Sequence, residues 1–136
     1  MGVARTVVLV LGAIYVVVGI VGFIPGLVTG GPPAGMESAQ GNLLGIFPVN
    51  ALHNIVHLAI GAALLYGATN TSAAISVARI IGVVYVVVGL LGFVAPDTFG
   101  LMPIGGADIF LHLATGAILL AIGFMDLDRG RADARI

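Results

Sequence analysis

The chain consists of long apolar stretches separated by short connections, and each stretch is long enough to cross a lipid bilayer. Four such stretches run approximately over residues 6–28, 46–67, 74–96 and 104–125. A hydrocarbon core about 30 Å thick is crossed by about 20 helical residues. The pattern therefore predicts an all-α protein, a four-helix transmembrane bundle, with residues 1–136 forming a single integral membrane domain.

The four stretches are related in pairs, because two motifs occur twice. These are YVVVG at 15–19 and 85–89, and HLAIGA at 57–62, which returns as HLATGA at 112–117. The repetition predicts two helical hairpins, repeat one over about 5–67 and repeat two over about 75–125, before a cytoplasmic tail at 126–136. Both hairpins enter from the same side, which makes a parallel repeat with a pseudo-twofold axis along the membrane normal.

The composition also indicates a membrane protein. Hydrophobic residues make up 60% of the chain, charged residues make up 8%, and the mean hydropathy is +1.20. A soluble domain has about 25% charged residues. We therefore expect the lipid bilayer as a partner and no contact with nucleic acid. Little surface remains outside the membrane, so the apolar exterior is also available to other membrane-protein subunits or to self-association, as in a small accessory subunit.

The arginines predict the orientation of the bundle, since the chain has no lysine. Arg5 precedes the first stretch, Arg79 lies near the start of the third, and the other three arginines follow the fourth. The connections at 24–45 and 95–103 contain none. The positive-inside rule then predicts a multi-pass protein of the inner (plasma) membrane with both termini cytoplasmic. The first stretch is too long for a signal peptide and is expected to be retained.

The two connections on the predicted outer side differ in length. The longer one contains a glycine- and proline-rich segment at 30–38, for which two interpretations stay open, a flexible loop, which we favour, or a lid over the mouth of the bundle. Glu37 and Asp97 in these connections are expected to be solvated. Pro48 and Pro103 suit the first turn of the second and fourth helices, where a missing N–H costs little.

One face of the first and third helices is predicted to pack against other helices. Its members share spacings of three and four residues and are Gly12, Tyr15, Gly19 and Gly22, with Gly82, Tyr85, Gly89 and Gly92. Small residues on one face let membrane helices approach closely. Both tyrosine hydroxyls should therefore point into the bundle, where each needs a partner.

Four ionisable side chains stand at matching places inside the apolar stretches. His53 lies one helical turn before His57, and Asp108 lies one turn before His112. Counted from the prolines at 1.5 Å per residue, they should lie about 8 Å and about 14 Å into their helices. The tyrosines of the first and third helices should reach a similar depth. The arithmetic predicts one polar layer built from all four helices.

This layer is a candidate metal site. Two imidazoles one turn apart can grip a metal ion, and His53, His57, His112 and Asp108 together suit zinc, iron, copper or manganese. Asn50 and Asn54 could orient a ligand from behind, as could Tyr15 and Tyr85. Haem is the related possibility, with the two deeper histidines as axial ligands.

Other interpretations of the layer stay open. A buried Asp is costly in a membrane unless it is neutral, paired or bound to a cation. His53 could bond Asp108 while the deeper histidines bond the tyrosines, which would only fix helix packing. The same groups could relay protons or sense pH near the ordinary imidazole pKa of about 6.5. Catalytic residues are not assigned, and an enzyme is expected only if the histidines act. The lack of cysteine excludes disulfides and thiol catalysis.

The segment FPVNALHNIVHLAIG at 47–61 resembles the signature of a bacterial family of four-helix membrane proteins that is catalogued only as a domain of unknown function. The likeness extends over nearly the whole chain. More distantly, the chain resembles the DoxX-type four-helix membrane proteins. The resemblance implies a fold and a membrane location, and it implies no activity.

Overall fold

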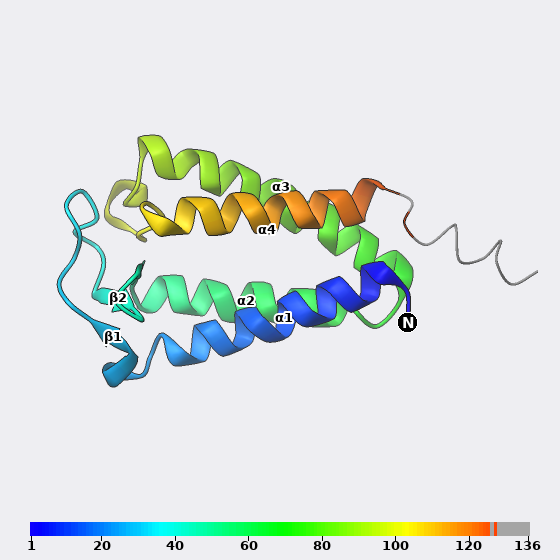
Figure 1. The fold of residues 1–136 in the computed structure, drawn as a ribbon, viewed down its shortest axis with the longest axis horizontal. Helices are drawn as coiled ribbons and strands as arrows, with labels where there is room; N and C mark the ends of the chain where they lie inside the picture. The colour runs from blue at the N-terminus through cyan, green and yellow to red at the C-terminus, as the bar shows by residue number, and fades with distance from the viewer. Residues whose placement is uncertain (126, 128–136) are drawn as a thin grey trace, which may run out of the picture.

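The computed structural model describes residues 1–125 and 127, and in this part four helices lie side by side with alternating direction (Figure 1). They are α1 Val3–Val21, α2 Ala51–Gly67, α3 Thr71–Val94 and α4 Ala107–Phe124. The predicted all-α, four-helix class is confirmed. The N-terminus, the α2–α3 turn and the last residues of α4 share one end, here called the turn end, and the long connections form the loop end. The predicted charged tail at 126–136 falls outside the described residues, Leu127 apart.

Three of the helices, α1, α3 and α4, are long and apolar enough to cross a membrane, so the chain is a membrane protein. The prediction of four full-length helical spans needs correction, since α2 has 17 residues and rises only about 26 Å. Residues 47–49 just before it form a strand, and extended chain rises about 3.3 Å per residue. Together the strand and α2 cover about the thickness that the other helices cover alone.

The loop end carries a small antiparallel sheet that the hydropathy pattern did not predict. Its strands, in spatial order, are β1 Val28–Thr29, β2 Gly41–Leu43 and β3 Phe47–Val49. Pro48 therefore lies in a strand and not in the first turn of α2, as predicted. Pro48 lies on β3, an edge strand, where a residue without an N–H is tolerated, and it pairs with Asn42 on β2.

The first and fourth helices are both shorter than the predicted stretches. Helix α1 ends at Val21, because Pro25 follows within a short 3₁₀ turn, η1 Pro25–Leu27, and residues before proline avoid helical geometry. Helix α4 begins at Ala107, so Pro103 precedes it and does not occupy its first turn. Gly106 stands at its N-cap with φ of 63°, a conformation that favours glycine.

The long connection packs onto the loop end of the bundle. Met36 and Ala39 are buried, and the Ser38 backbone N–H and hydroxyl both donate to the Asp97 carboxylate. Asp97 is only partly exposed and bonds to Ser38, whereas Glu37 is exposed, as expected. The connection is therefore tied to the loop end at Met36, Ser38 and Ala39, and both interpretations of its role stay predictions.

Close backbone contacts hold α1 on α2 and α3 on α4. A Cβ added at Gly61 would lie 2.8 Å from the Val16 nitrogen, and one at Gly116 would lie 2.9 Å from the Val86 nitrogen. Every glycine and tyrosine of the predicted packing face is buried. The prediction that small residues let these helices approach closely is confirmed.

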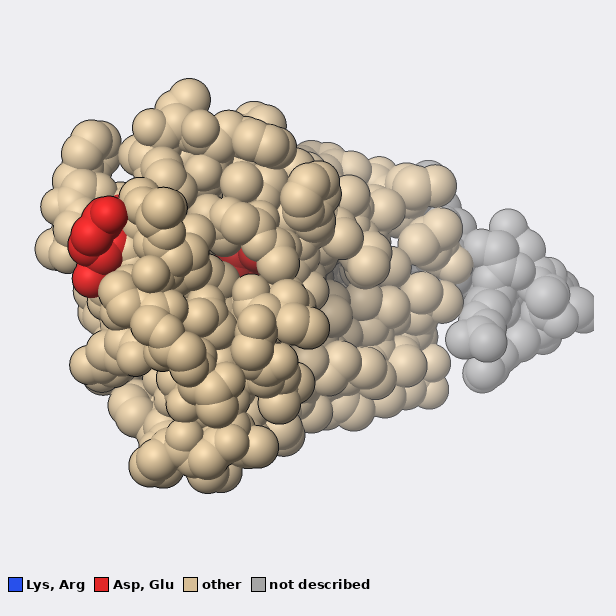
Figure 2. Space-filling model, turned by 60° about the vertical axis from the view of Figure 1, so that its left-hand side comes forward, with Lys and Arg blue, Asp and Glu red and all other residues tan. Residues whose placement is uncertain are grey.

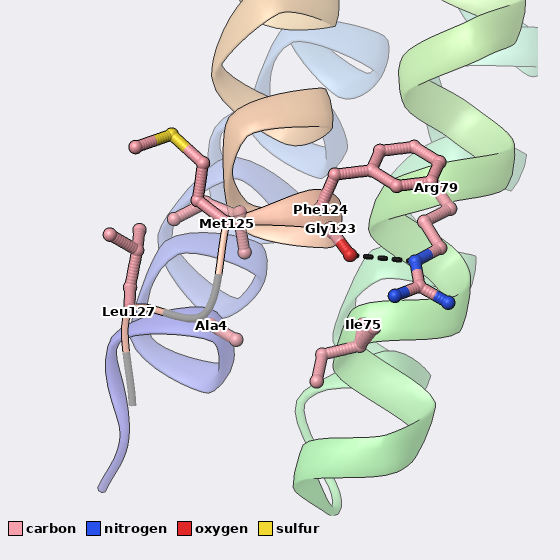
Figure 3. A pocket seen from close by; sticks show the side chains of 8 residues that line it. Ala4, Ile75, Arg79, Gly123, Phe124, Met125 and Leu127 are labelled. Atoms are coloured by element: carbon pink, nitrogen blue, oxygen red, sulfur yellow. Dashed lines mark hydrogen bonds between the residues drawn. The ribbon is translucent and has the colours of Figure 1, made fainter. Parts of the chain in front are cut away.

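Two arginines close the turn end. Arg5 Nε donates to the Ala68 carbonyl over 2.8 Å, and Arg79 Nε donates to the Gly123 carbonyl over 2.6 Å (Figure 3). Each guanidinium thus meets carbonyl groups at the C-terminal end of a helix, where the helix dipole is negative. The Arg79 guanidinium also lies 4.8 Å from the centre of the Phe124 ring. A cavity of about 130 Å³ lies beside it.

Candidate metal centre

The first two turns of α2 and α4 carry the ionisable cluster. Helix α2 starts where the Asn50 side chain accepts a hydrogen bond from the His53 backbone N–H over 2.9 Å, so His53 lies in the first turn and His57 one turn later. Asp108 lies in the first turn of α4, with His112 one turn later. His53 and Asp108 therefore lie closer to their helix starts than the predicted 8 Å, because both helices begin after their prolines.

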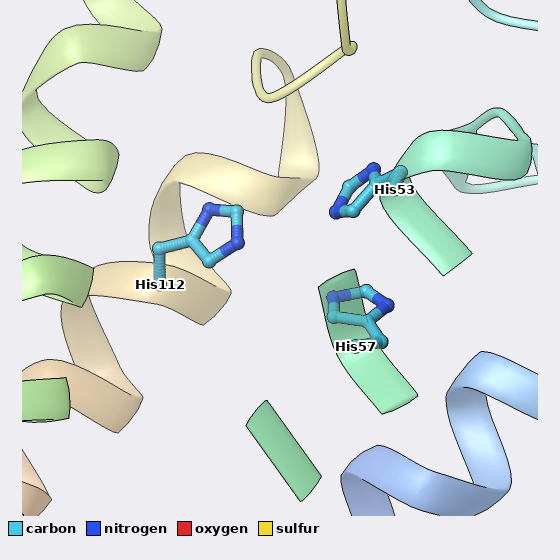
Figure 4. A group of neighbouring side chains, drawn as sticks. All are labelled: His53, His57 and His112. Atoms are coloured by element: carbon cyan, nitrogen blue, oxygen red, sulfur yellow. The ribbon is translucent and has the colours of Figure 1, made fainter. Parts of the chain in front are cut away.

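All three histidines of the chain meet in this cluster. One ring nitrogen from each of His53, His57 and His112 can be chosen so that all three lie within 4.8 Å of one another. The rings of His53 and His57 are 4.4 Å apart between centres, and those of His53 and His112 are 6.2 Å apart. Figure 4 shows the α2 rings and the α4 ring turned toward a common space. Each histidine is at most 3% exposed.

Asp108 stands beside the histidines without a hydrogen bond to them. Its Oδ2 atom lies 3.7 Å from His53 Nε2, and the residue is 1% exposed. That separation is longer than a hydrogen bond, which requires about 2.7–3.2 Å. The interpretation in which His53 bonds Asp108 is thus not realised in this geometry.

The two tyrosines flank the cluster from α1 and α3. The Tyr15 ring meets the His57 ring edge-on at 5.3 Å, and the Tyr85 ring stacks on the His112 ring at 5.1 Å. The Tyr15 hydroxyl donates to Thr115 Oγ1 over 3.2 Å and not to a histidine. Thr115 was missed in the sequence, although one signal was present, because it replaces Ile60 in the otherwise repeated HLAIGA motif.

Several buried polar atoms in this layer have no hydrogen-bond partner among the described residues. They are the Nδ1 atoms of His53, His57 and His112, the Tyr85 hydroxyl, Asp108 Oδ2 and Asn54 Oδ1. Leaving a buried polar group unpaired costs about 1–3 kcal/mol. A network that served helix packing alone would pair these atoms. The three imidazoles and Asp108 are close together in this layer, so one bound ligand could partner several of these atoms.

The two asparagines of the candidate site lie apart from the histidine rings. The Asn50 amide donates to the carbonyls of Ser38 and Leu101, which ties both outer connections to the start of α2. The Asn54 side chain faces α1, where a Cβ at Gly22 would lie 2.1 Å from its Oδ1. Asn50 thus acts on the cluster by positioning α2 and not as a direct partner of a ligand nitrogen.

The space between the histidines fits an ion and not a macrocycle. A cavity of about 50 Å³ lies between their rings, with Tyr85 and Met102 in its wall. This is room for a few waters, since one water needs about 10–15 Å³ of such space, whereas pockets for larger ligands measure about 300–1,000 Å³. Haem between His57 and His112, one of the sequence-based possibilities, does not fit there. A tetrahedral zinc ion would hold its ligand atoms about 3.3 Å apart, so the imidazoles need a modest inward movement.

Comparison with known proteins places the chain in a family. The model of the family described as "Domain of unknown function (DUF4383)" matches residues 5–125. The chain belongs to this family. The predicted resemblance to a family of unknown function is thereby confirmed, while the bacterial origin and the DoxX likeness stay predictions. No curated protein matches the chain, and no solved structure matches it.

Proposed function

We propose that this membrane protein binds a transition-metal ion between His53, His57 and His112, with Asp108 as a nearby carboxylate. The observation that carries the proposal is that one ring nitrogen from each of the three histidines lies within 4.8 Å of the others, in a buried layer where their Nδ1 atoms lack hydrogen-bond partners among the described residues. Imidazole nitrogen suits zinc, copper, iron and nickel, and a nearby carboxylate adds manganese to the range.

The chemistry of the layer supports a cation. Three neutral imidazoles can each present a lone pair to a metal, and coordination would partner nitrogen atoms that otherwise remain unpaired. Asp108 offers negative charge 3.7 Å from His53, which offsets part of the charge of a divalent ion. A carboxylate inside apolar surroundings is costly by itself, and a neighbouring cation lowers that cost.

Elemental analysis tests the proposal. The protein is purified from its own membranes without chelators, and its metal content is compared with that of the His57→Ala/His112→Ala double variant. We expect near-stoichiometric zinc, iron, copper or manganese in the unmodified chain and its loss in the double variant. Thr115→Val is the matched control, because it removes a polar group from the same layer without removing a ligand nitrogen.

Folding must be followed in the same samples. Helical content by circular dichroism and elution as one sharp particle should be alike in all three proteins. Equal metal content in the unmodified chain and the double variant would contradict the proposal. So would a metal-free protein that takes up no zinc when it is titrated.

A proton relay is the second candidate function, favoured by the ring contacts that run from His53 to His57 and on to Tyr15. It requires these groups to exchange protons across the layer. Proteoliposomes would then show a proton flux that falls in His57→Ala. If proteoliposomes show no proton flux with either the metal-free or the metal-loaded protein, the proton-relay function is contradicted.

The setting in the membrane is part of the proposal. We infer that the turn end faces the cytoplasm, supported by Arg5 and Arg79 at that end and by the positive-inside rule. The inner membrane is the location this implies. The chain acts as one domain that arose by duplication of a hairpin, an origin supported by the repeated motifs.

A further inference from the structure

A large apolar groove lies between α1 and α4, which contact each other much less than α1 contacts α2 or α3 contacts α4. Its volume is about 430 Å³, within the usual range for small-molecule sites. The side chains that line it come mostly from α1, α4 and the sheet with its β2–β3 turn, together with His57 of α2, and most are aliphatic, among them Val18, Leu43 and Leu111.

The groove opens on the side of the bundle that faces the bilayer. Ile14, Val17 and Leu44 line it and are 49%, 57% and 64% exposed. Figure 2 shows the described surface from the loop end as almost entirely uncharged, with small acidic areas and no basic ones. A molecule dissolved in the membrane could therefore enter sideways, without passing through water.

The inner end of the groove is polar. Tyr15, His57, Asp108 and Thr115 all line it. The Nδ1 atom of His57 and the Oδ2 atom of Asp108 are buried and lack hydrogen-bond partners among the described residues. Both residues are at least nine-tenths buried, so two unsatisfied groups stand at the end of an apolar channel.

Charge decides which head group suits this end. The lining contains no arginine, and both described arginines bond to carbonyls at the turn end. A phosphate or carboxylate head would meet Asp108 without a compensating cation. A neutral hydroxyl group can instead donate to the Asp108 carboxylate and also bond to the His57 imidazole, and an aromatic ring can contact Tyr15 and Phe47.

From these observations we infer that the groove binds a neutral amphiphile, in which an uncharged ring with a hydroxyl group meets His57 and Asp108 while an apolar tail lies between α1 and α4. The inference goes beyond the metal site and does not require the metal. His57 belongs to both the groove and the metal site. The groove therefore connects the histidine cluster with the bilayer.

Native mass spectrometry of the intact protein tests the inference with three probes that share a dodecyl tail. They are 4-dodecylphenol, which is neutral, dodecanoate, which is an anion, and dodecylamine, which is a cation. We expect one dodecylphenol to remain bound per chain and at least tenfold weaker binding of dodecanoate, which Asp108 repels. Binding of dodecylamine in preference to dodecylphenol would mean that the groove selects a cation at Asp108, and it would overturn the inference. This comparison uses the unmodified chain, so it does not depend on any variant folding.

Two variants locate the site. Val18→Phe fills the groove and should weaken dodecylphenol binding at least tenfold. Val87→Phe is the control, because Val87 is 56% exposed on α3, lies in the other YVVVG motif and is outside the groove lining. Equal binding of all three probes, or dodecylphenol binding that Val18→Phe leaves unchanged, would overturn the inference. Dodecylphenol binding is measured with and without added zinc. Because the inference does not require the metal, loss of dodecylphenol binding in both conditions counts against the inference alone, and absence of zinc uptake counts against the metal proposal alone.

Discussion

At the residue scale, the polar layer is unusual for how little hydrogen bonding it contains. The Tyr15 hydroxyl donates to Thr115, while the hydroxyl of the opposite tyrosine, Tyr85, has no hydrogen-bond partner among the described residues. The two halves of the bundle are therefore chemically unequal at this depth. The difference comes from one residue, Thr115, where the first repeat has Ile60.

Replacing Thr115 by valine should destabilise the bundle, because it leaves the Tyr15 hydroxyl buried without its acceptor. Hydrogen bonds between membrane helices contribute about 0.5–2 kcal/mol. We expect a loss in that range for Thr115→Val, measured by reversible denaturation in mixed detergent micelles. Tyr15→Phe/Thr115→Val should be less destabilised than the sum of the single variants. Strict additivity would mean that the two side chains do not interact.

At the element scale, the start of α2 is the structure on which the site depends. Asn50 caps the helix at His53 and also bonds to both outer connections, so the cap, the loops and the first ligand form one unit. Asn70 caps α3 by the same kind of bond, to the Ala73 N–H over 2.9 Å, but its end of the bundle holds no histidine.

Asn50→Ala should therefore cost more stability than Asn70→Ala. Loss of a cap costs about 0.5–2 kcal/mol, and Asn50 loses two further hydrogen bonds. We also expect zinc affinity to fall in Asn50→Ala but not in Asn70→Ala, because the Asn50 cap holds the turn of α2 that carries His53. Denaturation and zinc titration of both variants give the two readouts. Equal zinc affinity in the two variants would mean that Asn50 does not position the site.

The glycine contacts make a second prediction about elements. A Cβ at Gly61 would lie 2.8 Å from the Val16 backbone nitrogen, so Gly61→Ala must push α1 and α2 apart. Overpacking of this kind costs about 1–3 kcal/mol. Gly26→Ala is the control, since nothing lies within 4 Å of a Cβ there. Thermal denaturation should show a lower midpoint for Gly61→Ala only, and similar midpoints would argue against the close contact.

The sequence predicted the helices, their order and the polar layer, because apolar length and three-to-four-residue spacing are local signals. It did not predict the sheet. Residues around Pro48 are apolar enough to extend a helix, and only their pairing with β2, distant in the chain, makes them a strand. The contact between Ser38 and Asp97 was also missed, since it joins two connections that show no pattern in common.

At the scale of the whole molecule, α1 begins and α4 ends at the turn end. The two long connections pack together at the opposite, loop end. The polar layer therefore lies nearer to the loop end. If the turn end is cytoplasmic, an ion would reach the histidines from the outer side, past the packed connection.

Cysteine labelling checks this orientation without interference, because the chain has no cysteine. Glu37→Cys places a thiol in the exposed outer connection, and Thr69→Cys places one in the exposed α2–α3 turn. In intact cells from which any outer membrane has been removed, a membrane-impermeant maleimide should label the first variant and not the second. After lysis both should react. Labelling of Thr69→Cys alone before lysis would reverse the orientation.

The central claim is that three imidazoles hold one metal ion, and X-ray absorption spectroscopy at the zinc edge tests it most directly. One equivalent of zinc is added to the purified chain, and the spectrum is compared with that of His112→Ala. The account predicts three imidazole nitrogens at about 2.0–2.1 Å in the unmodified chain and at most two in the variant. A shell of oxygen ligands without imidazole, or identical spectra for the two proteins, would contradict it.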